Sequence, residues 1–278
     1  MAGLPLSSGN RRYGARVGQR GTRYTFHKPP QGTYLPTRFS IEEHCGWVKD
    51  HGTQGSCTAH GSISEREFIA RKFKQGAPTL SPSFVYYQER LLEGTLADGD
   101  CGAQVVTGVE VLNQFGAPLL SQEPYDENVY ELAPTAAQLQ EALSWKGGAP
   151  LQIQQDLADI KATIHSGFPF VIGINVFSSF ESDAAAATGL IPFPDMTSET
   201  LLGGHEVLAG VAWDDDIQCP NSSIGALKFQ NSWGTDWGCI GGYAGTRGFG
   251  WIPYEYILSA TLTTDVRMSS PLATMRRS

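Results

Sequence analysis

The sequence predicts an α+β protein of two lobes, with a helical first half, a β-rich second half and a cleft between them. Helical patterns dominate from about residue 45 to 148, whereas short apolar runs rich in β-branched residues dominate from about 149 to 265. The chain has 278 residues, of which 41% are hydrophobic. This is enough to bury the core of one large domain or of two lobes of ordinary size.

The two ends of the chain show no sustained apolar period. Residues 1–33 are rich in Gly, Pro and Arg, so we expect an extended arm there. The first 28 residues carry six basic residues and no acidic one, which fits either a solvated segment or an arm that docks onto an acidic body. Residues 34–265 are expected to form the folded domain, and residues 266–278 a flexible tail.

Five helices are predicted. The second begins with Pro82 at the first helical position, where the missing N–H is not needed. Gly116 and Gly167 end the third and the fifth, because glycine readily adopts the left-handed conformation that terminates many helices. The expected ranges are 57–73, 81–91, 105–116, 135–145 and 157–167.

The second half contains short runs that are typical of β-strands, at 170–177, 205–213, 224–233, 239–246 and 249–257. Between the first two runs, residues 180–203 are rich in Ala, Pro and Gly. We expect this stretch to be a long surface loop.

The composition argues against several classes of partner. A net charge of −8 and a pI near 5.2 argue against binding nucleic acid, because phosphates require a basic surface. No apolar run is long enough to span a bilayer, so no membrane partner is expected. The N-terminal arginines precede no hydrophobic stretch, which predicts no secretory signal peptide and leaves a cytoplasmic location or a signal-peptide-independent export route.

The cysteine pattern predicts neither a disulfide framework nor a metal site. The count is odd and the spacings are wide, so at least one thiol is free. No pair has CxxC spacing, and no histidine lies close enough to two cysteines to suggest zinc. We therefore expect no metal and no organic cofactor. The five cysteines are Cys45, Cys57, Cys101, Cys219 and Cys239.

Cys57 is the candidate nucleophile. Residues 51–56 form a flexible turn that leads directly into a helical pattern. At a helix N-terminus the macrodipole favours thiolate, and unpaired backbone N–H groups can bind an oxyanion. A cysteine considered alone is more often a small buried hydrophobic residue, so the setting is what favours catalysis.

A thiolate nucleophile also needs a base, and the base needs an orienting partner. His205 follows two glycines at the start of a predicted strand, and it is the candidate base. Asn231 lies further along the chain, and its amide oxygen could accept a hydrogen bond from the imidazole and fix its tautomer.

Three segments resemble the papain family (C1) of cysteine proteases. They are VKDHGTQGSCTAHG around Cys57, GGHEVLAGVAWDDD around His205 and NSWGTDWGCIGGY from Asn231. The third is the most specific, because two Trp and several Gly at fixed offsets have no general structural explanation. LSPSFVYYQERLLEG and GWIPYEYI resemble the bacterial-type branch of the family, and the resemblance covers roughly residues 34–258.

This resemblance implies a papain-like fold with a barrel-like second lobe and the active site in the cleft. Cys57, His205 and Asn231 would be the catalytic residues. Trp233 would shield the His–Asn hydrogen bond from water. Gly102 and Ala103 would match the backbone edge that pairs with an extended peptide.

The sequence departs from the family pattern at the oxyanion site and at one disulfide. His51 stands where the family has its oxyanion glutamine, and an imidazole N–H could take over that role. Gln54 is a less expected substitute. Gln54 and Asp100 occupy two half-cystine positions of the family, so the first lobe would lack that bridge.

These features predict a cysteine-type endopeptidase that acts on a peptide or protein substrate through a Cys57 thiolate–His205 imidazolium pair oriented by Asn231. The N-terminal arm could lie in the cleft as a short propeptide or lid. Three alternatives stay open: a weak or silent module that binds peptides or a partner, a transpeptidase with the same acyl-enzyme chemistry, and a structural component that uses the fold as a scaffold.

Overall fold

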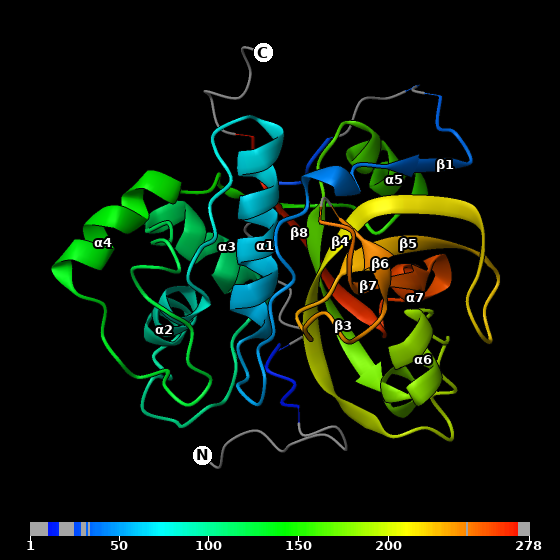
Figure 1. The fold of residues 1–278 in the computed structure, drawn as a ribbon. Helices are drawn as coiled ribbons and strands as arrows, with labels where there is room; N and C mark the ends of the chain where they lie inside the picture. The colour runs from blue at the N-terminus through cyan, green and yellow to red at the C-terminus, as the bar shows by residue number, and fades with distance from the viewer. Residues whose placement is uncertain (1–10, 17–24, 29–31, 33, 243, 272–278) are drawn as a thin grey trace.

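The computed structural model combines a group of helices and an antiparallel sheet, with helix α1 (Cys57–Lys72) between them (Figure 1). This confirms the predicted α+β class. The structure describes residues 11–16, 25–28, 32, 34–242 and 244–271.

The helical lobe contains four of the predicted helices. Helix α1 packs against α2 and α3 on one side and against the sheet on the other, and this is why nearly all of its residues are buried. Ser81 caps α2 by accepting from the Phe84 N–H at 3.4 Å. After α1, the helices are α2 (Pro82–Leu92), α3 (Val105–Gln114) and α4 (Ala136–Ala142), which continues into a 3-10 turn, η2 (Leu143–Trp145).

The sheet of the second lobe has eight described strands in the order β2-β8-β3-β4-β5-β7-β6, with β1 paired to the far part of β4. All neighbouring strands are antiparallel, and the sheet is open rather than closed into a barrel. Helix α5 (Leu157–His165) matches the predicted range. The strands are β1 (Arg38–Ser40), β2 (Pro150–Gln152), β3 (Phe170–Phe177), β4 (Leu201–Gln218), β5 (Ile224–Gln230), β6 (Cys239–Gly241), β7 (Thr246–Pro253) and β8 (Thr263–Ser269).

Two segments differ from the sequence-based expectation. The run 249–257 leaves the sheet at Pro253 and continues as helix α7 (Tyr254–Leu258). The expected surface loop 180–203 contains helix α6 (Asp183–Thr188), which Ser182 caps by accepting from Ala185 N–H at 3.2 Å. An alanine run with a cap forms a short helix even where flanking Pro and Gly suggest a loop.

The flexible tail predicted for residues 266–278 overlaps the last strand of the sheet. Residues 266–269 belong to β8, which lies between β2 and β3 in the sheet. Val266 and Met268 are buried in the core, so this strand is retained by packing. The predicted start of the tail at residue 266 is therefore wrong, because β8 continues to Ser269.

The N-terminal arm is described in two pieces, and both pair with the body. Residues 11–16, dark blue in Figure 1, lie beside the start of α1. Further along, His27 N–H donates to the Gln152 carbonyl at 2.7 Å, and Gln152 N–H donates to the Thr25 carbonyl at 3.0 Å. The second piece thus covers the free edge of β2, which would otherwise expose unpaired backbone groups.

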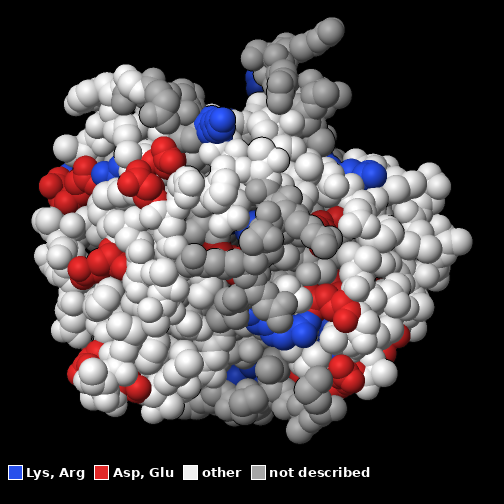
Figure 2. Space-filling view, turned by 180° about the vertical axis from the view of Figure 1, so that it is seen from behind, with Lys and Arg blue, Asp and Glu red and all other residues white. Residues whose placement is uncertain are grey.

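Acidic side chains are spread over the face of the molecule seen in Figure 2, and basic side chains lie in its upper part and below its centre. In the described part of the chain, no helix has the length and apolar character needed to cross a bilayer.

Candidate active site

Cys57 is the first residue of α1, and its side chain is fully buried. The turn before it is tight, with Gly52 in the left-handed region at φ 56°. Main-chain groups of Glu206 and Gly14 contact the thiol and act to lower its pKa. Because Glu206 directly follows His205, the fold brings the predicted nucleophile and base together from different lobes.

His205 lies on β4, and Asn231 directly follows the neighbouring strand β5, so the two residues lie side by side. The Nε2 atom of His205 is 2.8 Å from the Asn231 side-chain oxygen, which also accepts from the Ser232 N–H at 2.9 Å. Because an amide oxygen only accepts, Nε2 carries the proton and Nδ1 keeps its lone pair. Within the described residues Nδ1 is buried without a hydrogen-bond partner.

Trp233 stacks on His205, with ring centroids 5.0 Å apart and an angle of 25° between the planes. The indole therefore covers the imidazole beside its bond to Asn231. Trp233 and Asn231 are both buried, with exposed fractions of 3% each. A hydrogen bond in such a dry environment is stronger than one open to water.

His51 lies next to this group, with its ring centroid 5.8 Å from that of His205. Its Nδ1 atom is 2.9 Å from the Gln54 carbonyl, and its Nε2 accepts from the Trp233 indole N–H at 3.1 Å. Both ring nitrogens are therefore engaged, and neither offers an N–H to an oxyanion. Burial, and then the neighbouring His205, lower the pKa of His51 well below its usual value, so the ring is neutral.

The Gln54 side chain points away from the nucleophile. Its amide donates to the Glu127 carbonyl at 3.2 Å, and Tyr125 O–H donates to its oxygen at 3.3 Å. Gln54 thus anchors the loop around residue 127 to the active-site turn.

Burial sets the ionisation of Cys57 and His205. It raises the pKa of the Cys57 thiol to about 12, against the main-chain hydrogen bonds from Glu206 and Gly14. Burial also lowers the pKa of His205 to about 4, although its hydrogen bond to Asn231 acts in the opposite direction. With the arm in place, the pair is a neutral thiol and a neutral imidazole at pH 7.

The arm occupies the backbone edge around Ala103. Ala103 N–H donates to the Gly14 carbonyl at 2.9 Å, and Arg16 N–H donates to the Ala103 carbonyl at 2.8 Å. On the other side of the cleft, Ala15 N–H donates to the Gly204 carbonyl at 2.9 Å. The segment therefore bridges the two lobes directly above the nucleophile.

Two glycines allow this close approach. A Cβ atom on Gly102 would lie 1.8 Å from the Gly14 carbonyl oxygen, and Gly102 also has a positive φ of 71°. A Cβ atom on Gly14 would lie 1.7 Å from the Gly55 carbonyl oxygen. Neither position has room for a side chain while the arm is bound.

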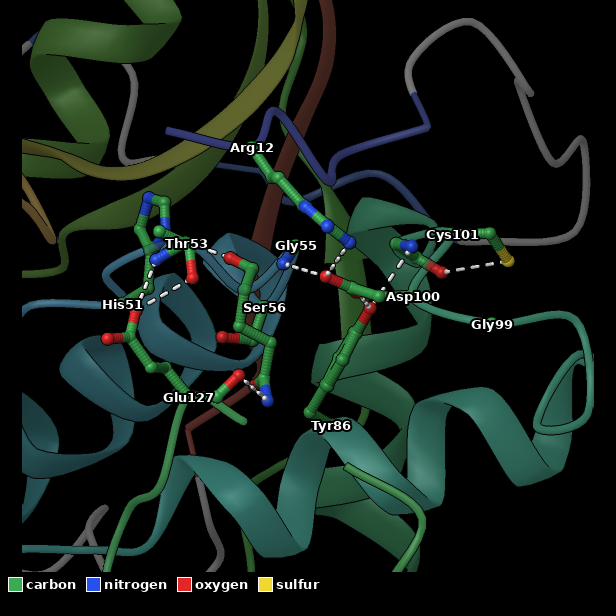
Figure 3. A network of polar contacts seen from close by, with 12 residues as sticks. Arg12, His51, Thr53, Gly55, Ser56, Tyr86, Gly99, Asp100, Cys101 and Glu127 are labelled. Carbon is green, nitrogen blue, oxygen red and sulfur yellow. Dashed lines mark hydrogen bonds and ion pairs between the residues drawn. The ribbon is translucent and has the colours of Figure 1, made fainter. Parts of the chain in front are cut away.

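Asp100 holds the active-site turn in place by hydrogen bonds (Figure 3). Its carboxylate accepts from the Gly55 N–H at 2.9 Å and from the Tyr86 hydroxyl, and Arg12 of the arm reaches it at 3.1 Å. The carboxylate thus joins the active-site turn to α2. All five cysteines of the chain are free.

Sequence reasoning missed two groups of residues around the site. The first is a pair of buried carboxyls, those of Glu65 and Glu89, which lie near Glu206. The second is a set of acidic residues that contact the arm, namely Asp50, Glu93 and Glu181. These residues come from distant parts of the chain, so no local motif unites them. The arginines of the arm could have predicted the second group, because they need acidic partners on the folded domain.

An antiparallel sheet and a helical lobe that meet at buried cysteine, histidine and asparagine side chains define the class of papain-like cysteine proteases. No family model matches the chain. It is similar to an uncharacterized peptidase C1-like protein, L477, of Acanthamoeba polyphaga mimivirus. The two are 33% identical over 226 residues, which cover 78% of this chain and 67% of the other.

Among solved structures, the fold is similar to that of xylellain, a cysteine protease from Xylella fastidiosa. The TM-score is 0.81 and the identity 27%, and the match covers 93% of this chain and 96% of that one. Procathepsin B S9 from Trypanosoma congolense has the same fold, with a TM-score of 0.72, 17% identity and coverage of 95% and 87%. The chain belongs to the papain family (C1) of cysteine proteases.

Proposed function

We propose that the chain is a cysteine endopeptidase that hydrolyses peptide bonds at Cys57 and that residues 11–16 hold it inactive. The observation that carries the proposal is the His205–Asn231 hydrogen bond of 2.8 Å, because it leaves the buried Nδ1 atom as a base. A base oriented in this way is what a thiol nucleophile requires.

The first half of the reaction forms an acyl-enzyme. His205 Nδ1 takes the Cys57 proton, and the thiolate attacks the scissile carbonyl carbon. The Cys57 main-chain N–H, at the unpaired start of α1, donates to the oxyanion. The C–N bond then breaks, and the imidazolium gives its proton to the leaving amine. Asn231 keeps the imidazole in the tautomer that this transfer needs.

The second half hydrolyses the thioester. His205 Nδ1 takes a proton from an attacking water, and the new oxyanion collapses to release the acid product and the Cys57 thiolate. The proton on the imidazolium then returns to sulfur. Attack by an amine in place of water would give a transpeptidase, and product analysis distinguishes the two outcomes.

The direction of the arm supports inhibition rather than cleavage. Because the leaving amine receives its proton from His205, the substrate residues after the scissile bond would extend past His205 and Trp233. In the arm, the N-terminal residues lie there: the Tyr13 ring is 6.0 Å from that of His205, and the Arg11 guanidinium is 4.7 Å from the Trp233 centroid. The arm therefore runs opposite to a productive peptide, and the Gly14 amide faces the nucleophile.

A cleavage assay with a peptide library tests the proposal. The full chain, a chain without residues 1–33 and the Cys57→Ala variant of each are compared, with products identified by mass spectrometry. We expect hydrolysis by the shortened chain, slower hydrolysis by the full chain and none by Cys57→Ala. If the shortened chain is folded, cleaves no peptide and shows no enhanced alkylation of Cys57 near neutral pH, the proposal fails.

A further inference from the structure

We propose that Glu93 is a specificity-determining residue that binds a basic side chain, so that the enzyme prefers peptides with Arg or Lys on the acyl side of the scissile bond. The inference rests on the proposed peptidase function, and it names the substrate class of that same site. The folded domain provides the Glu93 carboxylate, and the arm provides the arginine side chain that this carboxylate binds.

The contact between Arg16 and Glu93 carries the inference. The Arg16 guanidinium forms an ion pair with the Glu93 carboxylate, and the Glu93 side chain is only 7% exposed. The same Arg16 donates its backbone N–H to Ala103, which is the edge that holds the arm. A basic side chain in a segment bound along this edge therefore reaches a nearly buried carboxylate.

Glu93 is fixed in position before any peptide arrives. It directly follows α2, and its Oε1 atom accepts from the Gln104 N–H at 2.8 Å, at the start of α3. The other oxygen, Oε2, faces the guanidinium of the arm. A carboxylate held by a backbone donor loses little side-chain entropy when it binds a cation, which favours discrimination.

The position of Glu93 assigns it to the acyl side. Residues 11–13 of the arm lie at His205 and Trp233, where the leaving amine departs. Arg16 lies beyond Gly14 in the other direction, next to Ala103. Peptide residues N-terminal to the scissile bond would occupy that part of the cleft, although they would run in the direction opposite to the arm.

Two further carboxylates at the cleft meet arginines of the arm, and they are weaker candidates. Asp50 is 3.6 Å from Arg11, but its side chain is 52% exposed, so water screens its charge. Asp100 is 3.1 Å from Arg12, but its oxygens already hold the active-site turn. Glu93 combines burial with an oxygen directed at the bound segment.

The test uses the full chain with Gly14→Ala, which displaces the arm by the clash described above, and Tyr13→Ala as a second displacing variant. Matched peptides carry Arg, Lys, Met or Glu at each of the three positions before the scissile bond. We expect kcat/KM for the best Arg peptide to exceed that for its Met counterpart at least about tenfold. Adding Glu93→Gln, which retains an acceptor for the Gln104 N–H, should reduce this ratio about tenfold.

Adding Glu93→Lys should make Glu peptides better substrates than Arg peptides. Asp98→Asn, which removes a charge from the same loop, is the matched control and should leave the Arg-to-Met ratio unchanged. Equal kcat/KM for Arg and Met peptides at all three positions would overturn the inference and leave the peptidase proposal intact.

A binding measurement separates the two proposals. In Cys57→Ala/Gly14→Ala, which lacks the nucleophile, fluorescence anisotropy should show about tenfold tighter binding of labelled Arg peptides than of Met peptides. Glu93→Gln should remove the difference. If this preference is found while no variant with Cys57 cleaves any peptide, the peptidase proposal fails and the binding site stands. If Arg and Met peptides bind equally, the specificity site is refuted.

Discussion

At Cys57, the helix terminus and burial act on the thiol in opposite directions. The macrodipole of α1 favours the thiolate. Burial favours the neutral thiol and prevails, because it raises the pKa to about 12. The same burial, assisted by the positive charge of Arg11, lowers the pKa of His205 to about 4. The arm therefore covers both residues, and through Arg11 it also contributes to the lowered pKa of His205.

His51 shows how a residue at the expected position can be engaged elsewhere. The sequence places it at the oxyanion site, but its Nε2 atom accepts from Trp233 and its Nδ1 atom is bonded to the Gln54 carbonyl. An oxyanion needs a donor, and a neutral ring with both nitrogens engaged offers none.

Replacing His51 by glutamine should therefore raise kcat. In a Gly14→Ala background, His51→Gln introduces an amide donor, and an oxyanion donor typically contributes about 10²–10³ in kcat. We expect an increase of at least about tenfold, measured with a fluorogenic peptide. Circular dichroism of both proteins checks that the fold is kept. An unchanged or lower kcat would mean that the imidazole already donates to the oxyanion during turnover.

Among the elements, the arm is attached by backbone pairing at two places, the cleft and the edge of β2. Only the first contact covers the nucleophile. Its geometry depends on Gly14, because a Cβ there would lie 1.7 Å from the Gly55 carbonyl oxygen. We therefore expect one methyl group at this position to separate the arm from the cleft.

Gly14→Ala should make Cys57 reactive in the full chain. Each unit by which its pKa falls raises the thiolate fraction at neutral pH about tenfold, so we expect alkylation by iodoacetamide to accelerate at least tenfold. Peptide mapping by mass spectrometry identifies the labelled cysteine. Lys28→Ala, elsewhere in the arm, should react like the original protein. Equal rates for all three proteins would show that the arm does not control the thiol.

Strand β8 is a part of the core, although its sequence resembles the start of a tail. Met268→Ala should lower the free energy of unfolding by about 2–5 kcal/mol, because Met268 is fully buried and its truncation leaves a cavity. Urea denaturation measures the loss. Leu258→Ala, at a side chain that is 37% exposed, should cost clearly less. Equal effects would mean that β8 does not contribute its packing to stability.

For the molecule as a whole, the buried carboxyls of Glu65, Glu89 and Glu206 couple stability to pH. Burial raises the pKa of Glu65 to about 7 and that of Glu89 to about 8, and it raises the pKa of Glu206 well above the usual range. In the folded protein at neutral pH, Glu89 and Glu206 are therefore protonated and Glu65 is about half protonated, whereas all three are ionised when the protein unfolds. Their contribution to stability is complete below pH 4.5 and is lost as the pH rises through the folded values.

Buried neutral histidines act at lower pH. Their folded pKa values are depressed, so the unfolded chain binds more protons below pH 6.5 and stability falls as the solution is acidified. Between pH 6.5 and 8, the carboxyl groups therefore dominate the pH dependence. The histidines concerned are His51, His60 and His205.

We expect the melting temperature to fall from pH 6.5 to pH 8. One buried carboxyl contributes a slope of up to about 1.4 kcal/mol per pH unit. Glu89→Gln mimics the protonated side chain and still accepts from the Thr58 hydroxyl, so it should flatten the fall. Glu141→Gln, on α4, is the control. Differential scanning calorimetry across this range gives the comparison, and a fall of the same size in Glu89→Gln would contradict the prediction.

The sequence by itself determined the elements and the chemical types of the site. Helix periodicity with Pro82 as a start signal predicted α2, and apolar β-branched runs predicted β3, because these signals are local. The specific NSWG segment led to Asn231. The sequence did not predict β8 or α6. Strand β8 is held by packing in the core, and helix α6 forms where Ser182 caps a run of alanines.

Only the tertiary structure decided how these residues act on one another. The Nε2 atom of His51 accepts a hydrogen bond from Trp233, which is 182 positions away in the chain, and so carries no N–H for an oxyanion. Glu93 receives Arg16 of the arm only because Ala103 holds that segment beside it. Burial, hydrogen-bond partners and ion pairs arise between segments that are distant in sequence, so no local pattern specifies them. The sequence supplied the nucleophile, the base and the orienting amide, while the fold set their ionisation and the occupant of the cleft.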